Sequence, residues 1–232
     1  MKFRIGIENN NEGFRSIAWV LEHPGCYAYG SNEQEALANS GKAIQEYAKW
    51  IEKHNTSWLP SSVDVETRLE QVWNDYFVDK NFERVERDGY AVEPFFEHDW
   101  KPLTETDIER GLKLLAWSHA DLLSVLDKLT PEQWATKKEG ERWDIGGIVR
   151  HVGGAEWWYL DQLGRAFPQA ELPKAPMERI EKVRNLMNEV LPTLKDVNQV
   201  VGAEGELWSP RKVLRRALWH ERDHTVHIQK LI

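Results

Sequence analysis

The 232-residue chain has a single cysteine, Cys26, and lacks any long uncharged apolar stretch. One thiol cannot form an internal disulfide, and its isolation fits a reducing compartment. No stretch approaches the roughly 18 apolar residues that a membrane span requires. The first ten residues alternate charged with apolar side chains, unlike a secretion signal. We therefore expect a cytoplasmic protein that does not enter the membrane.

The sequence also lacks blocks of positive charge. It has 30 Lys and Arg against 38 Asp and Glu, a formal net charge of -8, and no basic run long enough to follow a phosphate backbone. This pattern excludes nucleic acid as the expected partner. The partners we expect are a small-molecule substrate, with a low-molecular-weight thiol as one candidate, and a second copy of the chain in a homodimer.

The first 54 residues predict strands followed by a helix. Apolar and polar side chains alternate over residues 2–8, which is typical of a half-buried strand, and residues 9–13 form a turn cluster. Two more short strands should follow. Ser31 then opens a helix, and Gln34, three residues later, completes a capping-box pattern.

The segment PGCYAYG and the helix rich in Glu, Ala and Ile that follows it resemble the HicB family. The resemblance covers about residues 1–54. Members of this type use a small RNase-H-like or double-stranded-RNA-binding-like fold as an antitoxin or binding module. The resemblance implies a domain that recognises a partner, without catalysis.

Residues 55–101 contain the strand-like segments VDVETRL and YAVEPFF and a tight turn at Asp88-Gly89. We assign them to the sheet of the first domain. The period of the apolar residues changes from 2 to about 3.6 near Lys101. The predicted domains are therefore residues 1–101, a β-sheet-plus-helix domain, and residues 102–232.

The second domain is expected to be a four-helix bundle, which makes the whole chain an α+β protein. Thr104 or Thr106 can cap the first helix, whose first turn is acidic. The predicted helices begin at Thr104 or Thr106 and then cover about 144–163, 177–194 and 209–232. The loop between the second and third is long enough to cross the bundle.

The last predicted helix carries three histidines. His220 and His224 differ by about 40° around the helix and lie roughly 6 Å apart along its axis, so both imidazoles can reach one cation. His227 follows His224 by three residues, and that pair could chelate instead. His220 and His227 are about 10.5 Å apart along the axis and cannot both be ligands. The third ligand must come from another helix, and the helix carrying His151 is the natural donor.

Two segments, RWDIGGIVRHVGGAEWWYL and LRRALWHERDHTVHI, resemble the DinB/YfiT superfamily of bundles, over about residues 102–232. Members hold a divalent metal with one histidine from the second helix and two, spaced by four, from the fourth. The matching positions here are His151, His220 and His224. Some members are thiol-dependent transferases or isomerases and others are metal-dependent hydrolases, so the resemblance implies one of these activities.

Three protein ligands leave a position for water or a thiol, and a divalent ion lowers the pKa of such a group to roughly 7. Imidazole suits zinc, nickel, copper and iron, and no cysteine stands near these histidines in the sequence to give the thiolate set of a structural zinc site. We expect zinc or nickel, with iron or manganese as alternatives, and no organic cofactor.

Other polar and aromatic side chains are expected to be architectural. The tryptophans beside the histidines should be core anchors, with ligand stacking as the alternative. The basic cluster opening the last helix should be a solvated face, with binding of an anionic substrate group as the alternative. The acidic residues should face solvent, with orientation of an imidazole as the alternative. These sets are Trp143, Trp157, Trp158, Trp208 and Trp219; Arg211, Lys212, Arg215 and Arg216; and Glu156, Glu221 and Asp223.

His119 is expected to be structural, and His227 to lie in the pocket or at the surface. Gly153 and Gly154 should permit close helix approach or access to the metal. The sequence thus leaves two hypotheses: a metal-dependent hydrolase or thiol transferase acting on a small molecule, or a non-catalytic binding module with a structural metal and a HicB-like domain that recognises a protein.

Overall fold

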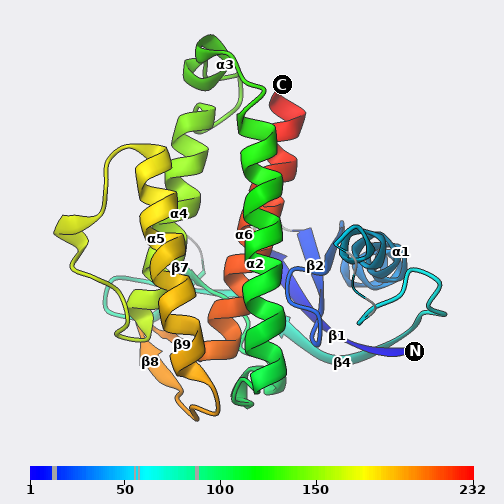
Figure 1. Ribbon diagram of the computed structural model, residues 1–232. Coiled ribbons are helices and arrows are strands. Elements are labelled where there is room, and N and C mark those ends of the chain that lie inside the picture. The colour runs from blue at the N-terminus through cyan, green and yellow to red at the C-terminus, as the bar shows by residue number, and fades with distance from the viewer. Residues whose placement is uncertain (12–14, 55, 57, 87–88) are drawn as a thin grey trace. The chain divides into compact units, whose positions relative to one another are not determined.

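The computed structural model describes residues 1–11, 15–54, 56, 58–86 and 89–232. It is a mixed α+β structure with an N-terminal sheet and a C-terminal helical region (Figure 1). Contacts divide the chain into unit 1, Met1–Trp100 with Gly202–Leu207, and unit 2, Lys101–Val201 with Trp208–Ile232. Among the described residues, no helix combines the length and apolarity needed to cross a membrane.

Unit 1 contains a four-stranded sheet in the order β3-β2-β1-β4, in which β1 is antiparallel to β2 and parallel to β4. The order of three strands and a helix in the first 54 residues agrees with the prediction, while the HicB-like identity stays a prediction. The elements are β1 (Lys2–Asn11), β2 (Arg15–Val20), β3 (Tyr27–Gly30), α1 (Glu33–Glu52) and β4 (Glu66–Asn74).

Two local predictions for unit 1 were wrong by one or two residues. The turn was expected from residue 9, but β1 runs to Asn11 through a register shift at which Asn10 has φ 65°. The cap of α1 is Asn32, whose side chain accepts from the Glu35 amide. Ser31 instead donates to the Glu35 carboxylate, so the expected pairing with Gln34 does not form.

The central strand of unit 1 is more buried than its alternation suggested. Glu8 is fully buried and accepts hydrogen bonds from Trp19 Nε1 at 2.7 Å and Asn11 Nδ2 at 2.6 Å. At Gly6, a Cβ would lie 2.8 Å from the Phe96 ring, so only glycine fits under that ring. Apolar contact therefore extends to both sides of β1.

The segment after β4 does not join the same sheet, contrary to prediction. Strands β5 (Tyr76–Val78), β6 (Arg84–Val85) and β7 (Tyr90–Val92) form a separate sheet in the order β6-β5-β7. Of the predicted turn at Asp88-Gly89, Asp88 lies outside the described residues, as do residues 12 and 13 of the first turn cluster.

Unit 2 contains the four predicted helices, which run side by side in Figure 1: α2 (Glu105–Leu126), α4 (Ile145–Gln162), α5 (Pro176–Val190) and α6 (Pro210–Leu231). Thr104 caps α2 in a capping box with Asp107, and Ser209 caps α6 through the Lys212 amide. The third helix ends earlier than predicted, because it is followed by a 3-10 turn, Leu191–Leu194, which contains Pro192 in its first turn.

Two short elements of the C-terminal half were not predicted. Helix α3 (Pro131–Ala135) stands between α2 and α4, and a hairpin of β8 (Val201–Ala203) and β9 (Glu206–Trp208) stands between α5 and α6. The hairpin turns through Glu204 and Gly205, both with positive φ, of 53° and 81°. Its tip belongs to unit 1, where Tyr90 donates a hydrogen bond to Glu206.

The helices of unit 2 pack closely around an apolar cluster. A Cβ at Gly153 of α4 would lie 3.0 Å from the Ile180 Cα of α5, so this glycine permits close approach of the two backbones, as expected. The cluster lies among α2, α4, α5 and α6. Its buried members are Leu122, Val125, Leu126, Ile145, Ile148, Val149, Val152, Ile180 and Ile228.

Candidate metal centre

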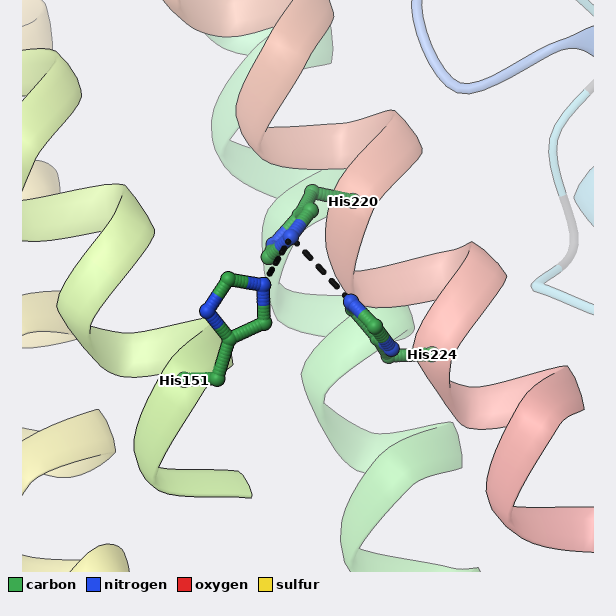
Figure 2. Close-up of side chains that lie close together, drawn as sticks. All are labelled: His151, His220 and His224. Atoms are coloured by element: carbon green, nitrogen blue, oxygen red, sulfur yellow. Dashed lines mark hydrogen bonds between the residues drawn. The ribbon is translucent and has the colours of Figure 1, made fainter. Parts of the chain in front are cut away.

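The structure brings His151, His220 and His224 together, as Figure 2 shows. His151 projects from α4, and the other two project from successive turns of α6. His220 Nε2 lies 3.1 Å from His151 Nε2 and 3.1 Å from His224 Nε2. The nitrogens that the three rings offer all lie within 4.8 Å of one another. This is the set of three that the DinB resemblance implied.

A divalent cation fits this arrangement better than a hydrogen-bonded cluster does. An imidazole nitrogen has one in-plane position, which holds either a proton or a lone pair. His220 Nε2 faces two other nitrogens, so it cannot form two well-directed hydrogen bonds. Ligand nitrogens about 2.0–2.1 Å from a tetrahedral zinc ion would stand about 3.3 Å apart, close to the observed 3.1 Å.

The surroundings keep all three imidazoles neutral, the form that binds metal. Burial, followed by the neighbouring His224, His151 and Arg216, lowers the pKa of His220 well below 6.5. Burial and His151 lower the pKa of His224 to about 3. Burial and Arg142 also lower the pKa of His151. Lone pairs are therefore available at neutral pH without displacement of a proton.

His227 does not join the cluster. Its Nε2 lies 3.0 Å from Glu141 Oε2, in the segment between α3 and α4, and its side chain is 34% exposed. The alternative chelating pair of His224 and His227 is not the one that the structure assembles. His224 Nδ1 is buried without a hydrogen-bond partner among the described atoms.

A buried charge network lies beside the histidines on the same helices. Arg184 of α5 donates to both Glu156 carboxylate oxygens, at 3.0 and 2.8 Å, to Glu221 at 2.9 Å and to the Leu115 carbonyl at 2.7 Å. His119 Nδ1 lies 3.2 Å from Glu221, so its expected structural role agrees with this network. Helices α2, α4, α5 and α6 thus all contribute to one network.

Two expectations of solvent exposure were therefore wrong. Glu156 and Glu221 are 2% and 0% exposed, because Arg184 compensates their charge inside the bundle. The basic cluster on α6 is not a solvated face either. Lys212 is buried with its ammonium 4.5 Å from the Trp208 ring centre. Arg216 is also buried, and its guanidinium carbon lies 4.3 Å from the Trp219 ring centre.

The tryptophans divide into two roles. Trp157, Trp208 and Trp219 are buried, as expected of core anchors. Trp143 is half-buried, and its ring centre lies 4.7 Å from that of His151. Trp143 and His151 line the same open pocket, with a volume of about 200 Å³. His151 therefore borders a space that a small molecule can enter.

Comparison with known proteins agrees with the C-terminal resemblance. Residues 114–228 match the model of the DinB superfamily. Among solved structures, YfiT from Bacillus subtilis, a probable metal-dependent hydrolase with an unusual four-helix bundle topology, matches with 18% sequence identity and a TM-score of 0.47. The match covers 62% of this chain and 93% of that chain. No curated protein is detectably similar in sequence.

The family match starts within α2 and ends within α6, and it includes all three clustered histidines. It does not reach the residues for which a HicB-like identity was predicted. The helical region of this chain therefore carries a DinB superfamily domain at residues 114–228.

Proposed function

We propose that this protein is a metal-dependent enzyme, a hydrolase or thiol-dependent transferase, that acts on a small molecule. His151, His220 and His224 hold the metal. The observation that carries the proposal is the convergence of three neutral Nε2 atoms from two helices. A divalent ion there supplies Lewis acidity and lowers the pKa of a bound water or thiol. Zinc or nickel suits the ligand set best, with iron or manganese next.

The rest of the bundle argues for a catalytic metal over a structural one. Structural zinc sites are closed by four protein ligands, whereas the cluster among the described residues has three. Helices α4 and α6 are already connected by Arg184 and by the apolar cluster. A metal is therefore not needed to hold them together, and an exchangeable coordination position remains available.

Elemental analysis of untagged protein tests the site. We expect about one divalent ion per chain, and less than about a tenth of it in His151→Ala and in His220→Ala, because two imidazoles hold an ion far less tightly than three. His227→Ala is the matched control and should keep its metal. Full metal in both ligand variants, or loss only in His224→Ala and His227→Ala, would contradict the assignment.

Cobalt-substituted protein separates the chemical alternatives. A small thiol that binds the metal should produce a sulfur-to-metal charge-transfer band, which His224→Ala should lack. No band in the intact protein would argue against thiol chemistry and leave hydrolysis or a structural metal. Unfolding on chelation, without turnover of any ester, amide or thiol substrate, would support the rival hypothesis of a binding module with a structural metal.

A further inference from the structure

The pocket beside His151 is bordered by arginines. Arg150 and His151 are neighbours on α4, Gly154 lies one turn further along, and Arg179 reaches the pocket from α5. Arg142 lies with its guanidinium 4.4 Å from the ring centre of Trp143, another lining residue. In a chain with a net charge of -8, two arginines thus line one small opening and a third stacks on one of its lining residues.

The position of Arg179 is fixed by its contacts. Its Nε donates to the Pro173 carbonyl at 2.6 Å and its Nη1 to the Arg150 carbonyl at 3.4 Å. A Cβ at Gly154 would stand 3.4 Å from Nη1, which is ordinary van der Waals contact, so this position lies directly against the guanidinium. Gly154, expected to permit close helix approach or access to the metal, thus lies beside an arginine of the pocket wall.

These positive charges are not neutralised by the protein. In the described part of the chain, neither Arg150 nor Arg179 forms an ion pair with a carboxylate. Burial, followed by the nearby charge of Arg150, lowers the pKa of Arg179. A guanidinium is planar and matches the oxygens of a carboxylate or a phosphate. The pocket therefore has the charge of an anion site.

We propose that Arg150 and Arg179 bind an oxyanion group, carboxylate or phosphate, of the small molecule that reaches the metal centre. The inference rests on the proposed function, because it assigns the chemical class of that site's ligand. The pocket volume of about 200 Å³ is below the range of about 300–1,000 Å³ for drug-sized ligands, so the ligand is small. One end lies at the arginines and the other at His151.

Cobalt-loaded protein provides the first test, with 3-mercaptopropionate as the anionic thiol and 2-mercaptoethanol as the neutral one. Arg150→Ala should lower the affinity of the cobalt-loaded protein for the anionic thiol about three- to tenfold, because a charge-assisted hydrogen bond is lost at a partly exposed site. It should leave 2-mercaptoethanol unchanged. Arg165→Ala, an exposed arginine outside the pocket, is the control and should change neither. Equal effects of Arg150→Ala on the two thiols, or no effect on either, would overturn the inference.

A second test does not depend on metal or on thiol binding. In metal-free protein, the side-chain NMR signals of Arg150 and Arg179 should shift on titration with malonate or inorganic phosphate, and malonamide should have no effect. The anion that binds more tightly shows whether the site prefers a carboxylate or a phosphate group. No shift with either anion overturns the inference, even if both thiols bind cobalt. Shifts without any thiol band sustain it while contradicting thiol chemistry. Both Arg150→Ala and Arg179→Ala should reduce these anion-dependent shifts, and Arg150→Ala still tests the site if Arg179→Ala fails to fold.

Discussion

The imidazoles of the candidate metal centre link metal binding to pH. His220 and His224 have pKa values far below the ordinary 6.5, mainly through burial. In the unfolded chain they would titrate near 6.5. Below that pH the unfolded state binds more protons than the folded one, so stability is present above pH 6.5 and is lost as the pH falls toward 3. We expect the metal-free protein to lose up to about 1.4 kcal/mol per pH unit for each such histidine.

Urea unfolding of metal-free protein between pH 7.5 and 5 measures this loss. His224→Gln, which removes one titrating group from the site, should flatten the profile, while His227→Gln should not. The positive charges of Arg142 and Arg216 face the cluster, lower the pKa of His151 and His220 further, and so widen the pH range over which stability is lost. A profile that is flat between pH 7 and 5 would contradict neutral buried imidazoles.

Single residues differed in how far the sequence could predict them. Helix geometry allows the pairing of His220 with His224, and it equally allows that of His224 with His227. His151 lies 69 positions from His220, so its assignment depended on the need for a third ligand from another helix and on the family resemblance. The burial of Glu221 was missed because its partner, Arg184, lies 37 positions away on another helix. Local patterns carry no information about such a partner.

At the scale of the helix, Arg184 joins α5 to its three neighbours. Replacing it with methionine keeps an unbranched apolar side chain, removes the guanidinium and leaves the Glu156 and Glu221 carboxylates buried without their partner. We expect Arg184→Met to lower the free energy of unfolding by about 3–5 kcal/mol in urea titrations, the range for breaking a buried ion pair.

The neighbouring Lys182 provides the control on the same helix. Its ammonium lies 3.6 Å from Glu171 with both side chains largely exposed, and such pairs contribute about 0–1 kcal/mol. Lys182→Met should therefore change stability by less than about 1 kcal/mol. Similar losses in the two variants would mean that the buried network does not stabilise the bundle.

Helix starts were easier to predict than helix ends or short strands. Thr104 and Ser209 were identified because a capping side chain leaves a local signal. The end of α5 was placed four residues late, since the 3-10 turn that follows keeps apolar residues at a helical period. The hairpin of β8 and β9 was missed because strands of three residues show too little alternation.

For the whole molecule, the change of periodicity near Lys101 predicts a separable C-terminal part. We expect a fragment of residues 101–232 to fold as a helical protein and to keep its metal, because Arg211 binds the carbonyls of Lys101 and Pro102 and all three histidines lie within unit 2. Circular dichroism and elemental analysis measure the two properties. An unfolded fragment beside a stable full chain would show that the halves depend on each other.

The hairpin of β8 and β9 has a consequence for synthesis on the ribosome. Unit 1 receives Gly202–Leu207 from a point late in the chain, after α5. The strands of its N-terminal sheet emerge first, yet the residues that meet Tyr90 emerge more than a hundred positions later, since Tyr90 and Glu206 are 116 apart. At about 5–20 residues per second, that delay is about 6–23 seconds. The unit that is made first is thus completed only after most of the chain has been translated.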